Sequence, residues 1–158
     1  MASQSDSVFL GAVQGQRLTS NHYNEHHIGE FFDALRRREG FLLTMGVGLQ
    51  KQGSEALPDQ AVLITPLGTV TIRALTICDR QELSAAILFT SPPEFPKDGD
   101  FVRLLALRLS QNGWADESGK IHVTHLGQLD LGSLLQLLQA RQLRANTELY
   151  ESFLRAPV

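Results

Sequence analysis

The stretch from Ala61 to Leu88 constrains the fold of this chain more than any other part. Two β-branched apolar runs flank Pro66-Leu67-Gly68, where proline presets φ and glycine can adopt positive φ, as a tight turn requires. The second run, Thr69–Cys78, alternates, with one face formed by Val70, Ile72, Ala74, Thr76 and Cys78. The pattern predicts two strands joined by a turn.

A central helix is expected directly after these strands. Asp79 and Glu82 have the spacing of a capping box. Leu83, Ala86 and Ile87 follow at helical spacing and would form the buried stripe. Ser91, which precedes two prolines, would end the helix because a residue before proline avoids the α region.

Two further helices are expected, one near each end of the chain. The first begins at Ser20 or Asn21 and ends at Gly40, and it buries Ile28, Phe31, Phe32 and Leu35. The second runs from Asp130 to Phe153, with a polar pair at Asn146-Thr147 as a candidate break. Its buried stripe contains Leu131, Leu134, Leu135, Leu138, Gln142 and Ala145.

The remaining elements complete an α+β prediction. Residues 8–13 and 41–50 are predicted strands, and residues 1–7 a flexible terminus. Phe101–Leu109 fits a helix or a strand, and leucine favours the helix; as a strand it would form a hairpin with Ile121–Leu126. We expect one domain over residues 8–158. It would have a mixed or antiparallel sheet of about five strands against an N-terminal helix, a central helix and a long C-terminal helix.

Composition excludes several kinds of protein. The 158 residues carry a net charge of −3, which argues against nonspecific nucleic-acid binding, since that depends on a basic surface. One cysteine excludes an internal disulfide framework and favours a cytoplasmic location. No apolar run approaches the roughly 20 residues of a membrane-spanning helix. Phosphate-loop and dinucleotide signatures are absent, so we expect no cofactor.

The sharpest local pattern is a histidine cluster at the start of the first long helix. His22 and His26 lie one helical turn apart, and Glu30 extends the same face. Two imidazoles and a carboxylate so spaced can bind a divalent metal, with Glu25 as a base. His22-x-x-Glu25-His26 resembles the inverted zincin motif over these five letters. The ordinary structural interpretation is a solvated first helical turn.

Cys78 is the other candidate for chemistry. It would end a strand at a helix N-terminus, where the helix dipole favours a nucleophilic thiolate. His122 and His125 are possible partners in space. The alternative is a buried core cysteine, because free cysteine is among the most buried residue types.

The C-terminal helix carries more apolar surface than one buried face requires. Leu137 and Leu143 lie off the main stripe, while Leu149 and Phe153 prolong it. A helix that is apolar on two sides suggests a partner or a second copy. Trp114, beside a predicted turn, either packs onto the core or contacts a partner. The predicted partner interface therefore contains Trp114, Leu137, Leu143, Leu149 and Phe153.

Two functions from different classes follow. The first is a non-enzymatic protein-binding or regulatory module, adaptor-like or chaperone-like, which acts as a homodimer or on a protein partner without nucleic acid or membrane. With Phe101–Leu109 as a strand, the element order resembles that of the class I secretion chaperones. That resemblance implies a small acidic α+β dimer that holds an unfolded client. The alternative is a small metal-dependent or thiol-dependent enzyme that uses His22, His26 and Glu30, or Cys78.

Overall fold

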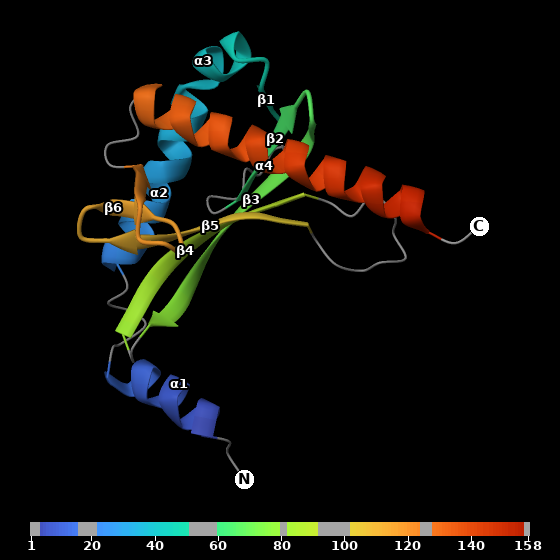
Figure 1. Cartoon of the computed structure of the whole chain (residues 1–158). Coiled ribbons are helices and arrows are strands. Elements are labelled where there is room, and N and C mark those ends of the chain that lie inside the picture. The colour runs from blue at the N-terminus through green and yellow to red at the C-terminus, as the bar shows by residue number, and fades with distance from the viewer. Residues whose placement is uncertain are drawn as a thin grey trace.

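The protein is an α+β fold built on one curled antiparallel sheet (Figure 1). The computed structural model describes residues 4–15, 22–50, 60–79, 82–91, 102–123 and 128–156. Within these ranges seven strands follow one another in chain order, and each pairs antiparallel with the next. They are β1 (Gly48–Leu49), β2 (Gln60–Thr65), β3 (Gly68–Asp79), β4 (Glu82–Ser91), β5 (Val102–Ser110), β6 (Gly113–Ala115) and β7 (Ile121–Val123). The predicted α+β class is confirmed, with an antiparallel sheet that has seven strands among the described residues where about five were predicted.

In the described part of the chain, four helices accompany the sheet. They are α1 (Gln4–Gly15), α2 (His22–Arg37), α3 (Glu39–Thr44) and α4 (Gln128–Arg155). The N-terminal and long C-terminal helices predicted from the sequence correspond to α2 and α4. The predicted division of the chain at residue 7 stays a prediction, and α1 crosses it. Among the described residues, none of the helices combines the length and apolar character needed to cross a membrane.

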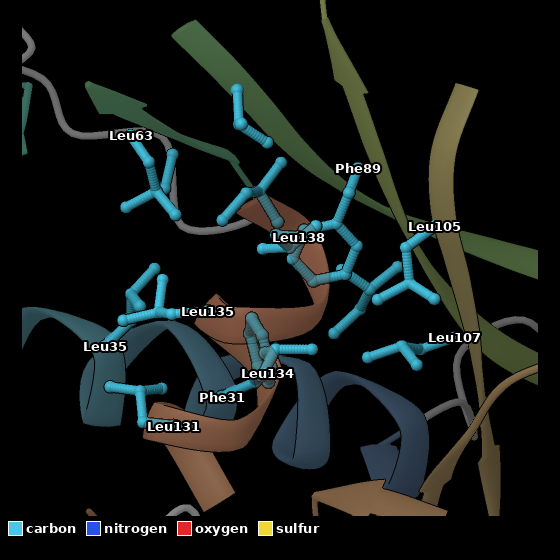
Figure 2. Packing of buried hydrophobic residues seen from close by; sticks show 14 of the residues in the cluster. Phe31, Leu35, Leu63, Phe89, Leu105, Leu107, Leu131, Leu134, Leu135 and Leu138 are labelled. Atoms are coloured by element: carbon cyan, nitrogen blue, oxygen red, sulfur yellow. The ribbon is translucent and has the colours of Figure 1, made fainter. Parts of the chain in front are cut away.

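The core lies between one face of the sheet and the two long helices (Figure 2). As predicted, α2 buries Phe31, Phe32 and Leu35, and Ile28 is half-buried against the same cluster. The stripe of α4 contributes Leu131, Leu134, Leu135 and Leu138, and the sheet adds side chains that include Leu63, Phe89, Leu105 and Leu107. The ring of Phe31 makes edge contacts with the rings of Phe89 and Trp114. Both helices are therefore fixed on the sheet by their apolar stripes.

The hairpin predicted around Pro66-Leu67-Gly68 is confirmed. β2 and β3 pair from Gln60↔Arg73 to Thr65↔Gly68, so Pro66 and Leu67 form a two-residue connection. Gly68 has a φ of +133°, which a residue with a Cβ rarely adopts. The Thr65 hydroxyl accepts a hydrogen bond from the Leu67 backbone N–H. Proline and glycine thus act here as the sequence indicated.

The predicted central helix is wrong, because the segment that carries Leu83, Ala86 and Ile87 is strand β4. β4 pairs with β3 from Thr71↔Thr90 to Asp79↔Glu82 and with β5 along its other edge. Pairing on both edges satisfies the strand backbone, and this long-range bonding outweighs the local capping signal. The element order of the class I secretion chaperones includes that helix, so the resemblance fails.

Three other local predictions are corrected. The ambiguous segment is strand β5, which was the alternative to the favoured helix. Residues 8–13 lie in helix α1 rather than a strand. Of residues 41–50, only Gly48–Leu49 is a strand, and 41–44 belong to α3. Gly46 ends α3 with a φ of +76°, and the Val47 N–H bonds back to the Leu42 carbonyl as in a glycine-terminated helix.

Helix α4 continues through the predicted break at Asn146-Thr147. The Thr147 hydroxyl donates to the Leu143 carbonyl one turn earlier, and the Asn146 amide donates to the Leu67 carbonyl. Both polar side chains therefore find partners without interrupting the helix. The helix begins at Gln128, two residues before the predicted cap at Asp130.

Candidate partner interface

The last turns of α4 present a group of exposed apolar side chains, here called the distal face. It consists of Leu143, Leu149, Tyr150, Phe153 and Leu154. Phe153 is 72% exposed and Tyr150 63% exposed, which is high for aromatic side chains, since these carry large apolar surface. On a helix, Leu149 and Phe153 form one i, i+4 pair and Tyr150 and Leu154 an adjacent one. The result is one broad apolar surface.

A polar clamp sets where the distal face begins. Gln142 on α4 is 2% exposed; its Nε2 donates to the Gly68 carbonyl at 3.1 Å. The Thr65 hydroxyl lies 3.0 Å from Oε1 of Gln142, and Nδ2 of Asn146 donates to the Leu67 carbonyl at 3.1 Å. These bonds fasten α4 to the β2–β3 turn.

Beyond the clamp, α4 projects past the strands (Figure 1). Residues 147–155 prolong the helix by roughly 13 Å at ~1.5 Å per residue, and the side chains of 146–155 are all exposed. A helix end in water gains nothing from exposed aromatic and leucine side chains, because their burial is what stabilises a packed helix. In the described structure the distal face therefore stays exposed to solvent.

Three of the five predicted interface residues lie on the distal face: Leu143, Leu149 and Phe153. Tyr150 and Leu154 were missed, although their spacing of seven and eleven residues from Leu143 marks the same helical face. Of the two alternatives for Trp114, the structure shows packing onto the core: the side chain is 4% exposed. Leu137 packs against the core of its own chain and does not join Leu143 in a second apolar face.

A second exposed apolar group lies on α1, here called the α1 face. It contains Val8, Phe9, Leu10 and Val13, all between 42% and 54% exposed. Residues 8–13 were predicted to form a strand, and no binding role was predicted for them. In Figure 1, α1 lies at the opposite end of the sheet from the C-terminal end of α4.

The histidine cluster lies on the first turns of α2. Nε2 of His26 is 3.1 Å from Oε1 of Glu30, and Nδ1 of His27 is 3.6 Å from the other carboxylate oxygen. The structure thus places His26 in contact with Glu30, as the predicted ligand set requires. It also places His27 in contact with Glu30, and His27 was not in that set. The side chain of His22 lies outside the described residues, so the set of His22, His26 and Glu30 stays a prediction. Within the described part, no three His, Cys, Asp or Glu side chains are grouped so as to hold a metal ion.

A groove of about 610 Å³ runs between α2 and the β5–β6 hairpin. One helical stripe forms its wall, with Tyr23, His27, Glu30 and Arg37, and Trp114 lies opposite. The edge of the Tyr23 ring packs against His27, with centroids 4.5 Å apart. The carboxylate of Glu30 is engaged by the two histidines, so the groove offers mixed polar contacts without a convergent catalytic set among its described side chains.

The environment of Cys78 differs from the one predicted. β4 pairs beside it, and Cys78 faces Leu83 in the β3–β4 register, so the helix N-terminus that would favour a thiolate is replaced by a strand. The side chain is half-buried. His125 and the side chain of His122, its candidate partners, lie outside the described residues.

No protein-family model, curated protein or solved structure matches this chain.

Proposed function

We propose that this protein is a non-enzymatic protein-binding module that works as a homodimer, with the distal face of α4 as its interface. The observation that carries the proposal is the projection of an apolar helix end beyond the clamp at Gln142 and Asn146. Apolar surface is what drives most protein association. The proposed setting is the cytoplasm, in keeping with a single free cysteine.

A matched pair of leucine substitutions tests this interface. Leu154 on the distal face is 62% exposed, and Leu43 on α3 is 61% exposed. Burying a leucine side chain contributes roughly 1.5–3 kcal/mol, so Leu154→Ser should weaken self-association at least about tenfold. Leu43→Ser should leave it unchanged, because Leu43 lies outside the distal face. Sedimentation velocity over a concentration series measures both dissociation constants.

Both variants should keep the thermal stability of the parent monomer, since each replaces an exposed side chain. Equal self-association of the parent and Leu154→Ser would contradict the proposed interface. A parent protein that stays monomeric at tens of micromolar would contradict the homodimer itself.

A metal-dependent role is the second candidate, and the contact of His26 and His27 with Glu30 is the observation that favours it. A non-enzymatic module should carry well below one equivalent of zinc when it is purified without a histidine tag and supplied with the metal. Elemental analysis of the dialysed protein gives the ratio. One equivalent that is lost in His26→Ala would replace the binding-module proposal with a metal site.

A further inference from the structure

The two exposed apolar faces of this chain lie too far apart to cover each other within one molecule. β3 carries Gly68, the clamp residue, at one end and Asp79 at the other. Its 12 residues span about 36 Å at roughly 3.3 Å per residue. α1 lies near the Asp79 end, and the distal face lies beyond the Gly68 end (Figure 1).

Helix α1 also needs a covering surface in order to be stable. It has 12 residues, and isolated helices of about this length are marginal in water. Gly11 lies in its interior and lowers its helix propensity further. All four side chains of the α1 face remain about half exposed, so about half of this apolar surface is left uncovered by its own chain.

We propose that each copy in the homodimer places its α1 face on the distal face of the other copy. The inference rests on the proposed function and names the surface that meets α4. A two-fold axis between the two ends of the molecule would create both contacts at once. The assembly would then be closed, because the same pair of surfaces is used twice.

The exposed areas agree with this pairing. A whole aromatic side chain carries roughly 150–250 Å² and an aliphatic one somewhat less, so the distal face presents on the order of 600 Å². On α1, Phe9, Leu10 and Val13 lie within about a third of the helix circumference and together present on the order of 300 Å², while Val8 lies to one side of them. Together, roughly 900 Å² per copy reaches the ~800 Å² per partner of a standard specific interface, whereas the distal face alone falls short.

Cross-linking between single cysteines tests the pairing. Gln14 on α1 and Thr147 on α4 are both exposed and border the two faces, so Gln14→Cys and Thr147→Cys leave the apolar side chains in place. Each is made in a Cys78→Ser background. The two variants, one with an added size tag, are mixed and treated with a short bismaleimide. We expect the mixed product, Gln14→Cys to Thr147→Cys, to exceed either self-linked product several-fold.

The other outcomes separate this inference from the proposed function. A dominant product between two Thr147→Cys chains would mean that α4 packs against α4 of the other copy. That result would support the proposed interface on α4 and contradict the proposed role of α1. A monomeric mass with no intermolecular product would overturn both. A monomer whose double variant, Gln14→Cys with Thr147→Cys, links within the chain would show that α1 covers its own α4, and would also overturn the inference.

Discussion

Two glycines show how one residue type has opposite roles in this fold. Gly68 has a φ of +133° at the β2–β3 turn, and an added Cβ would meet Nε2 of Gln142 at an ordinary 3.7 Å. Glycine is therefore required at position 68 because of its backbone conformation and not because a Cβ would lack space. Gly29 lies inside α2, where an added Cβ meets no atom within 4 Å.

Alanine at these two positions should shift stability in opposite directions. Gly68→Ala forces a Cβ residue into a strained φ and should lower the free energy of unfolding by about 1–3 kcal/mol. Gly29→Ala should raise it by roughly 0.5–1 kcal/mol, since alanine favours a helix interior over glycine. Urea denaturation of both variants measures the changes. Equal effects at both sites would contradict the assigned backbone roles.

At the residue scale, these features were predicted correctly because residues nearby in the sequence determine them. Pro66 and Gly68 predicted their turn, and the spacing of Phe31, Phe32 and Leu35 predicted the buried face of α2. The burial of Trp114 could not be predicted, because it depends on Phe31, whose ring lies 6.0 Å away across the core. The carboxylate contacts of His26 and His27 follow from helical spacing, although only His26 was predicted to be functional.

At the scale of elements, the position of α4 depends on its polar clamp to the β2–β3 turn. Gln142 was predicted to lie in the buried stripe, and it does. Its amide supplies a donor to the Gly68 carbonyl and an acceptor near the Thr65 hydroxyl. Neither partner could be read from the sequence, since Gly68 lies more than seventy residues earlier.

Removal of this clamp should be costly. Gln142→Ala removes the bonds of a buried amide to the Gly68 carbonyl and the Thr65 hydroxyl and should lower the free energy of unfolding by about 1–3 kcal/mol. The control is Gln136→Ala on the exposed side of the same helix, where a change within roughly 0.5 kcal/mol is expected. Chemical denaturation measures both; indistinguishable midpoints would argue that the clamp does not hold α4.

The errors at this scale share one cause. β4 was predicted as a helix because Asp79, Glu82 and the stripe at Leu83 satisfied local helix rules. The strand forms because β3 and β5 both pair with it, which no local pattern encodes. Strand pairing also decided the structure of β5, because the apolar periodicity of this segment fits a helix and a strand equally well. In α1, the helix and its exposed apolar face replaced a predicted strand.

At the scale of the whole molecule, the described residues form a core between the sheet and the two long helices, and they leave apolar side chains exposed on α1 and on the distal face. A folded monomer rarely exposes contiguous apolar patches beyond a few hundred Å², and larger ones mark interaction sites. A net charge of −3 is too small to oppose association strongly. The sequence indicated an excess of leucine on the last helix, but the fold was needed to show which side chains remain exposed.

Hydrogen–deuterium exchange of the unmodified protein tests the central claim, that the distal face of α4 is covered by association, most directly. Exchange of the amides in residues 147–155 is followed by mass spectrometry at low micromolar concentration and at tens of micromolar. Association protects the helix that it buries, so exchange should slow markedly at the higher concentration, while residues 131–138 in the core stay equally protected. Identical exchange of residues 147–155 at both concentrations, with a monomeric mass throughout, would contradict the account.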